Sequence, residues 1–152
     1  MLPPGKRRLP ELRLAVQYPA GKVGAPTRPM LRHWLRAACF LPAEITVRFV
    51  DAEEGQTLNQ QWRGKDYATN VLSFPYQNDT RVLGDLVLCL PVVASEAAAQ
   101  GKPLDAHFAH LVVHGMLHLQ GFDHETSAAD AAQMEARERE ILSTLGYPDP
   151  YL

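Results

Sequence analysis

The sequence predicts a single-domain protein of the α+β, or mixed α/β, class, with one mixed sheet of about four strands packed with helices. Three observations lead to this prediction. The chain has 152 residues, of which 46% are hydrophobic and 21% charged, as in an ordinary globular domain. Strand-like and helix-like segments follow one another in the order β-α-β-α-β-β-α-α-α. We find no internal repeat or linker, so we expect one domain over residues 1–152, beginning with a flexible basic tail over residues 1–10.

Hydrophobic periodicity and capping residues predict the individual elements. Apolar residues alternate in the strands and recur three and four positions apart in the helices. Thr27 and Asp51 stand where N-cap residues begin helices, and Pro91 and Gly101 bracket another helix. In chain order we predict a strand over 12–18, a helix over 27–40, a strand over 44–50, a helix over 52–62, strands over 69–76 and 83–90, and helices over 91–100, 104–120 and 127–146.

Composition favours a cytoplasmic protein without a membrane segment. No apolar run approaches the roughly 20 residues that span a bilayer, and the basic N-terminus lacks the apolar segment of a signal peptide. Cys39 and Cys89 lie in apolar stretches, where we expect buried, unpaired thiols. Residues 1–36 hold eight Lys or Arg against one acid (+7), and the remainder holds seven against sixteen (−9). The basic third could contact a polyanion such as nucleic acid, or could be an ordinary solvated surface.

Three histidines fall within the stretch HGMLHLQGFDH, residues 114–124. His114 and His118 are four residues apart and therefore share one face of the predicted helix. Gly121 would end that helix and turn the chain so that His124 approaches the same point. Three imidazoles leave a fourth tetrahedral position open, which is typical of a catalytic zinc whose bound water has a pKa of about 7. We therefore predict a metal site on a central helix and the following turn.

The residue between the first two histidines argues against a protease. Gly115 stands where a helical His-Glu-x-x-His motif carries its catalytic glutamate. Glycine predicts a cleft without a carboxylate beside the metal, which suits an approaching phosphate. His107 lies on the same stripe but two turns before His114, too far to share the metal, and His110 is rotated from that stripe, so we expect both to pack or to line the cleft wall. Asp123 could orient an imidazole or hold the local structure around the next helix start.

Three blocks of the sequence resemble the YbeY family, bacterial rRNA-maturation factors and endoribonucleases. They occur in the family's order and read RGKDYATNVLSFP at 63–75, LGDLVLC at 83–89 and HGMLHLQGFDH at 114–124. The resemblance implies a single-domain α/β fold with a histidine-bound metal, usually zinc, in a cleft. Residue by residue, it implies His114, His118 and His124 as metal ligands and Arg63 as a functionally important arginine facing the cleft.

The first block also carries candidate substrate contacts. The planar guanidinium of Arg63 could hold a phosphate and offset developing charge, although on sequence alone an ion pair with Asp66 or a nearby acid would be favoured. Lys65 is a candidate phosphate contact. Asn70 is a candidate substrate contact, and with Asp66 and Thr69 it could simply fix the loop before the strand.

Two further positions have alternative interpretations. Asp85 could be an acid in the cleft or merely a cap, and the sequence does not separate these roles. Phe74 and Pro75 could offer a nucleic-acid base a flat surface to stack on, but core packing is the favoured interpretation.

Residues and resemblance together predict a metal-dependent, single-strand-specific endoribonuclease that acts in 16S rRNA 3′-end maturation and ribosome quality control. One zinc ion per chain is the expected cofactor, with another divalent metal as the alternative. The expected partners are rRNA, the small ribosomal subunit and ribosome-associated proteins; the oligomeric state is left open. Cleavage could use a metal-bound hydroxide or the substrate's own 2′-OH. A non-catalytic, zinc-binding ribosome-assembly factor is the alternative function, and a zinc metalloprotease is disfavoured by Gly115.

Overall fold

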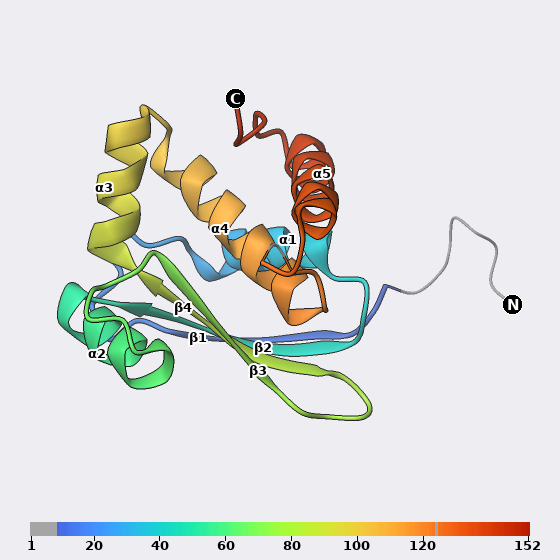
Figure 1. The fold of residues 1–152 in the computed structure, drawn as a ribbon, viewed down its shortest axis with the longest axis horizontal. Coiled ribbons are helices and arrows are strands. Elements are labelled where there is room, and N and C mark those ends of the chain that lie inside the picture. Colours follow the sequence, from blue (N-terminus) through green and yellow to red (C-terminus); the bar gives the residue numbers. More distant parts are fainter. Residues whose placement is uncertain (1–8, 124) are drawn as a thin grey trace, which may run out of the picture.

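The structure is a computed structural model that describes residues 9–123 and 125–152 (Figure 1). Within these residues one mixed sheet contains β1 (Leu12–Gln17), β2 (Ala43–Val50), β3 (Val71–Tyr76) and β4 (Val82–Cys89). The strand order is β1-β2-β4-β3, with β1, β2 and β4 parallel and β3 antiparallel to β4. The predicted mixed sheet of about four strands, and with it the α/β fold class, is confirmed.

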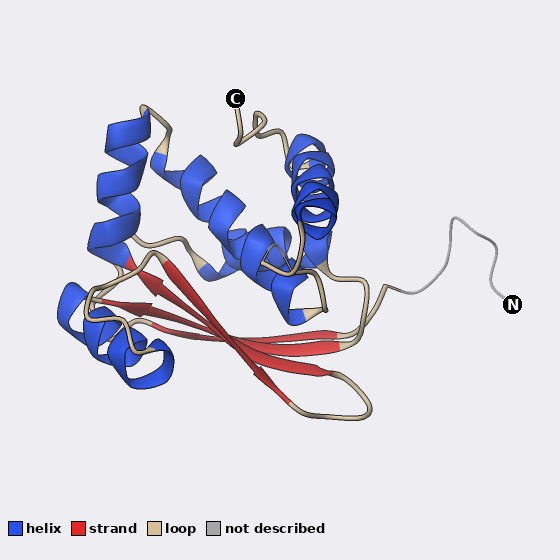
Figure 2. Cartoon of the chain, in the orientation of Figure 1, coloured by secondary structure: helices blue, strands red, loops and turns tan. Residues whose placement is uncertain are grey.

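Helices cover both faces of the sheet (Figure 2). They are α1 (Arg28–Ala38), α2 (Ala52–Arg63), α3 (Leu90–Gln100), α4 (Leu104–Leu119) and α5 (Ala128–Thr144). The main core lies between the sheet and α4, and α1 and α5 pack against α4 on this side. Helix α2 covers part of the other face, where a smaller apolar cluster includes Val87 and Cys89. Because β3 is an edge strand, residues from α2 and from α4 can approach each other around it.

The helices begin where capping chemistry predicts. The Thr27 hydroxyl accepts a hydrogen bond from the backbone N–H of Met30, and the Asp51 carboxylate accepts one from that of Glu54 at 2.8 Å. Each bond satisfies one of the backbone donors that a helix start leaves unpaired. Gly64 ends α2 in the left-handed conformation, with φ = 69°. This cap fixes the direction in which the last turn of α2 presents its side chains.

The strand predicted over 69–76 begins two residues later than expected. The side-chain oxygen of Asn70 accepts a hydrogen bond from the backbone N–H of Val71 at 2.6 Å. Its amide nitrogen donates to Glu96 at 3.0 Å. A side chain that bonds the neighbouring backbone favours a turn over an extended strand. Asn70 therefore holds the loop that enters β3.

The structure tests the predictions made from the cysteines, the basic N-terminal third and the absence of a long apolar run. Both cysteines are free thiols, as expected, but Cys39 is only partly buried, whereas Cys89 is buried. The Arg28 guanidinium donates to the backbone carbonyl of Leu14 at 2.7 Å, so this member of the basic third holds α1 against β1. None of the helices in the described ranges combines the length and hydrophobicity needed to cross a lipid bilayer. The tail predicted over 1–10 falls largely on residues 1–8, which lie outside the described residues.

Candidate active site

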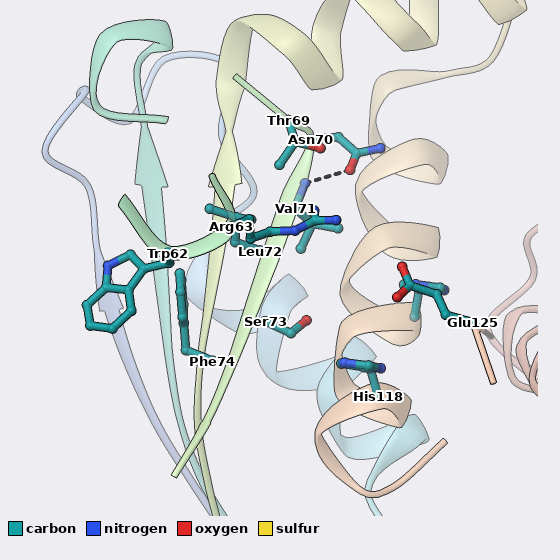
Figure 3. Close-up of a pocket in the computed structure, with 11 residues that line it drawn as sticks. Trp62, Arg63, Thr69, Asn70, Val71, Leu72, Ser73, Phe74, His118 and Glu125 are labelled. Carbon is teal, nitrogen blue, oxygen red and sulfur yellow. Dashed lines mark hydrogen bonds between the residues drawn. The ribbon is translucent and has the colours of Figure 1, made fainter. Parts of the chain in front are cut away.

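A cavity of about 430 Å³ lies along the edge strand β3. It is lined from three sides, by the end of α2, by the loop and strand of β3, and by α4 with the turn that follows it (Figure 3). Both faces of β3 contribute side chains because β3 is the edge strand of the sheet formed by the described residues. The lining residues are Trp62, Arg63, Thr69, Asn70, Val71, Leu72, Ser73, Phe74, His114, His118 and Glu125.

His114 and His118 both line this cavity from α4, as their spacing predicts. The Nδ1 atom of His114 is 2.5 Å from a carboxylate oxygen of Glu138, and that of His118 is 3.1 Å from the backbone carbonyl oxygen of Phe122. Both oxygens only accept hydrogen bonds, so Nδ1 carries the proton in each ring. In a neutral imidazole Nε2 is then the nitrogen with the lone pair that a metal requires.

Glu138 of α5 is the buried centre of a hydrogen-bonded cluster behind His114. Its fully buried carboxylate also contacts His110 Nε2 at 3.3 Å and accepts a hydrogen bond from the Tyr151 hydroxyl. Burial alone would raise the pKa of Glu138, but hydrogen bonds from His110, His114 and Tyr151 outweigh it and lower the pKa to about 2. Glu138 is therefore an ionised acceptor at neutral pH. A carboxylate that orients a histidine in this way is typical of the surroundings of a metal ligand.

The donor chemistry of the described histidines fits a divalent metal such as zinc. Two imidazoles one helical turn apart, each fixed through Nδ1, are ligands that zinc prefers. The third predicted ligand, His124, lies outside the described residues. In the part of the chain that the structure describes there is no cluster of three potential ligands. The three-histidine site therefore stays a prediction.

Arg63 lies in the cavity, at the last position of α2. Figure 3 shows its side chain running between the Trp62 side of the cavity and the side that carries His118. The alternative partner, Asp66, instead accepts a hydrogen bond from the Gln56 amide at 2.8 Å. No carboxylate of the described residues forms an ion pair with Arg63. The guanidinium therefore faces the cavity as a cation that could bind a phosphate.

The other predicted contacts are not all brought to this site. Asn70 lines the cavity, but both ends of its amide are already hydrogen-bonded within the protein. Lys65 is exposed and is not part of the cavity lining. Asp85 is neither a cleft acid nor a cap, because it lies within β4 and accepts a hydrogen bond from the Tyr76 hydroxyl at 2.7 Å. His107 is buried and contacts Glu96 at 3.0 Å, as a packing residue would.

The expectation of a cleft without a carboxylate is wrong, because Glu125 lines the cavity together with His114 and His118. A steric constraint explains why position 115 is a glycine. A Cβ atom at position 115 would lie 2.7 Å from a methyl carbon of Leu86 in β4. The glycine thus allows α4 to approach the sheet closely. This packing role explains Gly115 without reference to the substrate, so the glycine is weaker evidence for a phosphate substrate than the sequence indicated. Asp123 has the local role, accepting a hydrogen bond from the Glu125 backbone at 2.8 Å.

Sequence reasoning missed four residues of this site and its surroundings: Trp62, Glu125, Glu138 and Tyr151. A signal existed for Glu138. It lies on the stripe of α5 that also carries the buried Met134, Ile141 and Leu142, and a charged residue on an apolar stripe predicts a buried partner. For Tyr151, beyond the last helix and outside any motif, the sequence offers no such signal.

The fold and the cavity together define a class of protein, a single-domain α/β protein whose cleft combines a cation with candidate metal ligands. Over residues 26–146 the chain matches the family described as Endoribonuclease YbeY. It is 56% identical to Endoribonuclease YbeY of Paraburkholderia phymatum, over 95% of this chain and 98% of the relative. It is 58% identical to Endoribonuclease YbeY of Aromatoleum aromaticum, over 92% of each. The chain belongs to the YbeY endoribonuclease family.

A solved structure supports the fold independently. The solution structure of TM1509 from Thermotoga maritima superposes with a TM-score of 0.55 at 24% sequence identity. The match covers 87% of this chain and 91% of that protein. At this identity the likeness concerns the arrangement of strands and helices only.

Proposed function

We propose that this chain is a metal-dependent endoribonuclease that cleaves single-stranded RNA, in the maturation of the 16S rRNA 3′ end and in ribosome quality control. The observation that carries the proposal is the cavity at the edge of β3, where Arg63 from α2 meets His114 and His118 from α4. The relatives that match nearly the whole chain are named endoribonucleases, which favours an enzyme over a non-catalytic assembly factor. Neither the cavity nor the relatives favour a protease.

The residues of the cavity have different roles in phosphodiester cleavage. Arg63 binds the scissile phosphate through its planar fork of donors and stabilises the negative charge that develops in the transition state. His114, His118 and His124 would hold one zinc ion, which when bound would polarise a non-bridging phosphate oxygen. Glu138 and the Phe122 carbonyl orient the two helix histidines. We infer a cytoplasmic setting, with rRNA and the small ribosomal subunit as partners.

The test is a cleavage assay on a precursor of the 16S rRNA 3′ end, with zinc content measured on the same preparation. We expect cuts in the single-stranded precursor, no cuts when a complementary strand pairs it, and loss of cleavage with a chelator that added zinc reverses. A preparation of Arg63→Ala purified in parallel controls for contaminating nucleases. Intact precursor after incubation with the zinc-loaded chain would rule the proposal out.

Arg63→Ala is expected to lower kcat about 10²-fold while zinc content stays at the wild-type value, because the guanidinium touches substrate and not the ligands. Arg63→Lys should recover only part of the rate, since an ammonium keeps the charge but loses the fork. Arg137→Ala removes an arginine from the exposed surface of α5 and should leave the rate unchanged. Wild-type kcat in Arg63→Ala would contradict this role.

Glu138→Gln is expected to weaken zinc binding about 10- to 100-fold, because the amide is a poorer acceptor for the His114 Nδ1 proton than the carboxylate. Competition with a chromogenic chelator measures the affinity directly. Glu140→Gln, an exposed position on the same helix, provides the matched control. Equal zinc affinity in wild type and Glu138→Gln would show that Glu138 acts only in folding.

A further inference from the structure

An exposed tryptophan forms one wall of the cavity. Trp62 lines the cavity next to Arg63. Its large aromatic side chain is 64% exposed, whereas tryptophan is usually well buried. Its ring lies against Phe74, with centroids 6.0 Å apart and planes inclined by 70°. Figure 3 places both rings on the side of the cavity opposite His118 and Glu125, with Arg63 between the two sides. The cavity therefore has an aromatic wall and a histidine wall.

Rigid elements hold the aromatic wall. Trp62 belongs to the last turn of α2, whose end is fixed by the left-handed Gly64. Helix α2 packs closely on the sheet at Gly55. A Cβ atom at this position would lie only 3.2 Å from the Cys89 sulfur in β4. Phe74 belongs to β3 and pairs in register with Asp85 of β4. The two rings thus keep their relative position without a ligand, as a preorganised binding surface does.

The chemistry of this wall matches an unpaired nucleic-acid base. Bases stack on exposed aromatic rings with little regard to sequence, because every base has a flat π-face. A cation beside such a ring binds the phosphate of the same strand, and Arg63 is in that position. A base inside a duplex is already stacked on both faces and does not reach a ring in a cavity wall. This combination distinguishes single from paired strands.

We infer that Trp62, supported by Phe74, is a stacking platform for a base next to the phosphate that Arg63 binds, and that it gives the enzyme its preference for single-stranded RNA. The inference rests on the proposed function for the identity of the substrate. It adds a binding subsite on α2 and β3 that is separate from the histidines of α4. Phe74 packs against the smaller apolar cluster, in keeping with the core packing expected from the sequence, and it also supports the ring that contacts the base.

Tryptophan fluorescence tests the platform without cleavage. The chain has two tryptophans, and the other, Trp34, is only 2% exposed, so a bound base can quench only Trp62. The full chain is titrated with a short 2′-O-methyl RNA oligonucleotide, whose integrity is checked on a gel. We expect quenching by this single strand, and much less by the same strand in a duplex or with its bases removed. Equal quenching by the abasic strand, or no binding, would overturn the inference.

Binding by the variants completes the test. Trp62→Ala should weaken binding of the single strand about 5- to 150-fold, the range that corresponds to loss of one stacked base, and Trp62→Phe should weaken it less. Tyr67→Ala removes an aromatic ring that is 56% exposed but outside the cavity lining, and it should bind like wild type. Wild-type affinity in Trp62→Ala would overturn the inference. Normal stacking without RNA cleavage would instead contradict the proposed function alone.

Discussion

His118→Ala is expected to abolish metal-dependent cleavage of single-stranded RNA, with a fall in kcat of at least about 10³-fold, or about 4 kcal/mol of transition-state stabilisation. The variant removes one of the proposed ligands, and the two remaining imidazoles hold zinc too weakly to survive dialysis. We expect the zinc content to fall to a small fraction of the value measured for the wild type. Both quantities are measured on one preparation, cleavage by gel and zinc by atomic spectroscopy.

His118 is a cleaner test than His114. The Nδ1 atom of His118 bonds the backbone carbonyl of Phe122, whereas His114 is one of three groups that bond the buried carboxylate of Glu138. Removing His114 would therefore also disturb the packing of α5 on α4. His33→Ala, an exposed histidine on α1, is the matched control and should keep full activity. Undiminished cleavage by metal-free His118→Ala would refute a metal-dependent mechanism.

Local features of the fold could be predicted because they depend on neighbouring residues. Thr27 and Asp51 cap helices in the structure as their side chains predict. The helical spacing of His114 and His118 places both in one cavity. Gly121 has φ = 109°, a conformation in which glycine is favoured, and the chain turns there after α4. Each of these inferences needs only the geometry of one turn of helix.

Features that depend on packing between distant segments could not be predicted in this way. Glu138 is 24 residues from His114 in sequence and meets it only because α5 packs on α4. Trp62 lines the cavity because β3 is the edge strand, and strand order is not visible in hydrophobic periodicity. The position of Arg63 also depends on packing between distant segments. Sequence alone favoured a pair with Asp66, and the family resemblance correctly assigned Arg63 to the cleft.

Gly115→Glu, which would restore the glutamate of the protease motif, is expected to destabilise the protein by about 4 kcal/mol or more. The new Cβ atom would meet the fully buried Leu86 at 2.7 Å, and the carboxylate would follow it into the interface between α4 and β4. Burying a charge without a partner and overpacking a core both cost free energy. The gain from replacing a helical glycine, about 1 kcal/mol, does not offset them.

Urea unfolding followed by circular dichroism measures this loss, with two variants as comparisons. Gly115→Ala should lose less than about 2 kcal/mol, because the clash remains but no charge is buried and the helix gains. Ala132→Glu introduces the same side chain at an exposed position of α5 and should change stability by less than about 0.5 kcal/mol. A stable Gly115→Glu variant that hydrolyses peptides would show that only the missing base separates this site from a protease. We expect instead that close packing of α4 on the sheet excludes a glutamate at this position whatever the substrate.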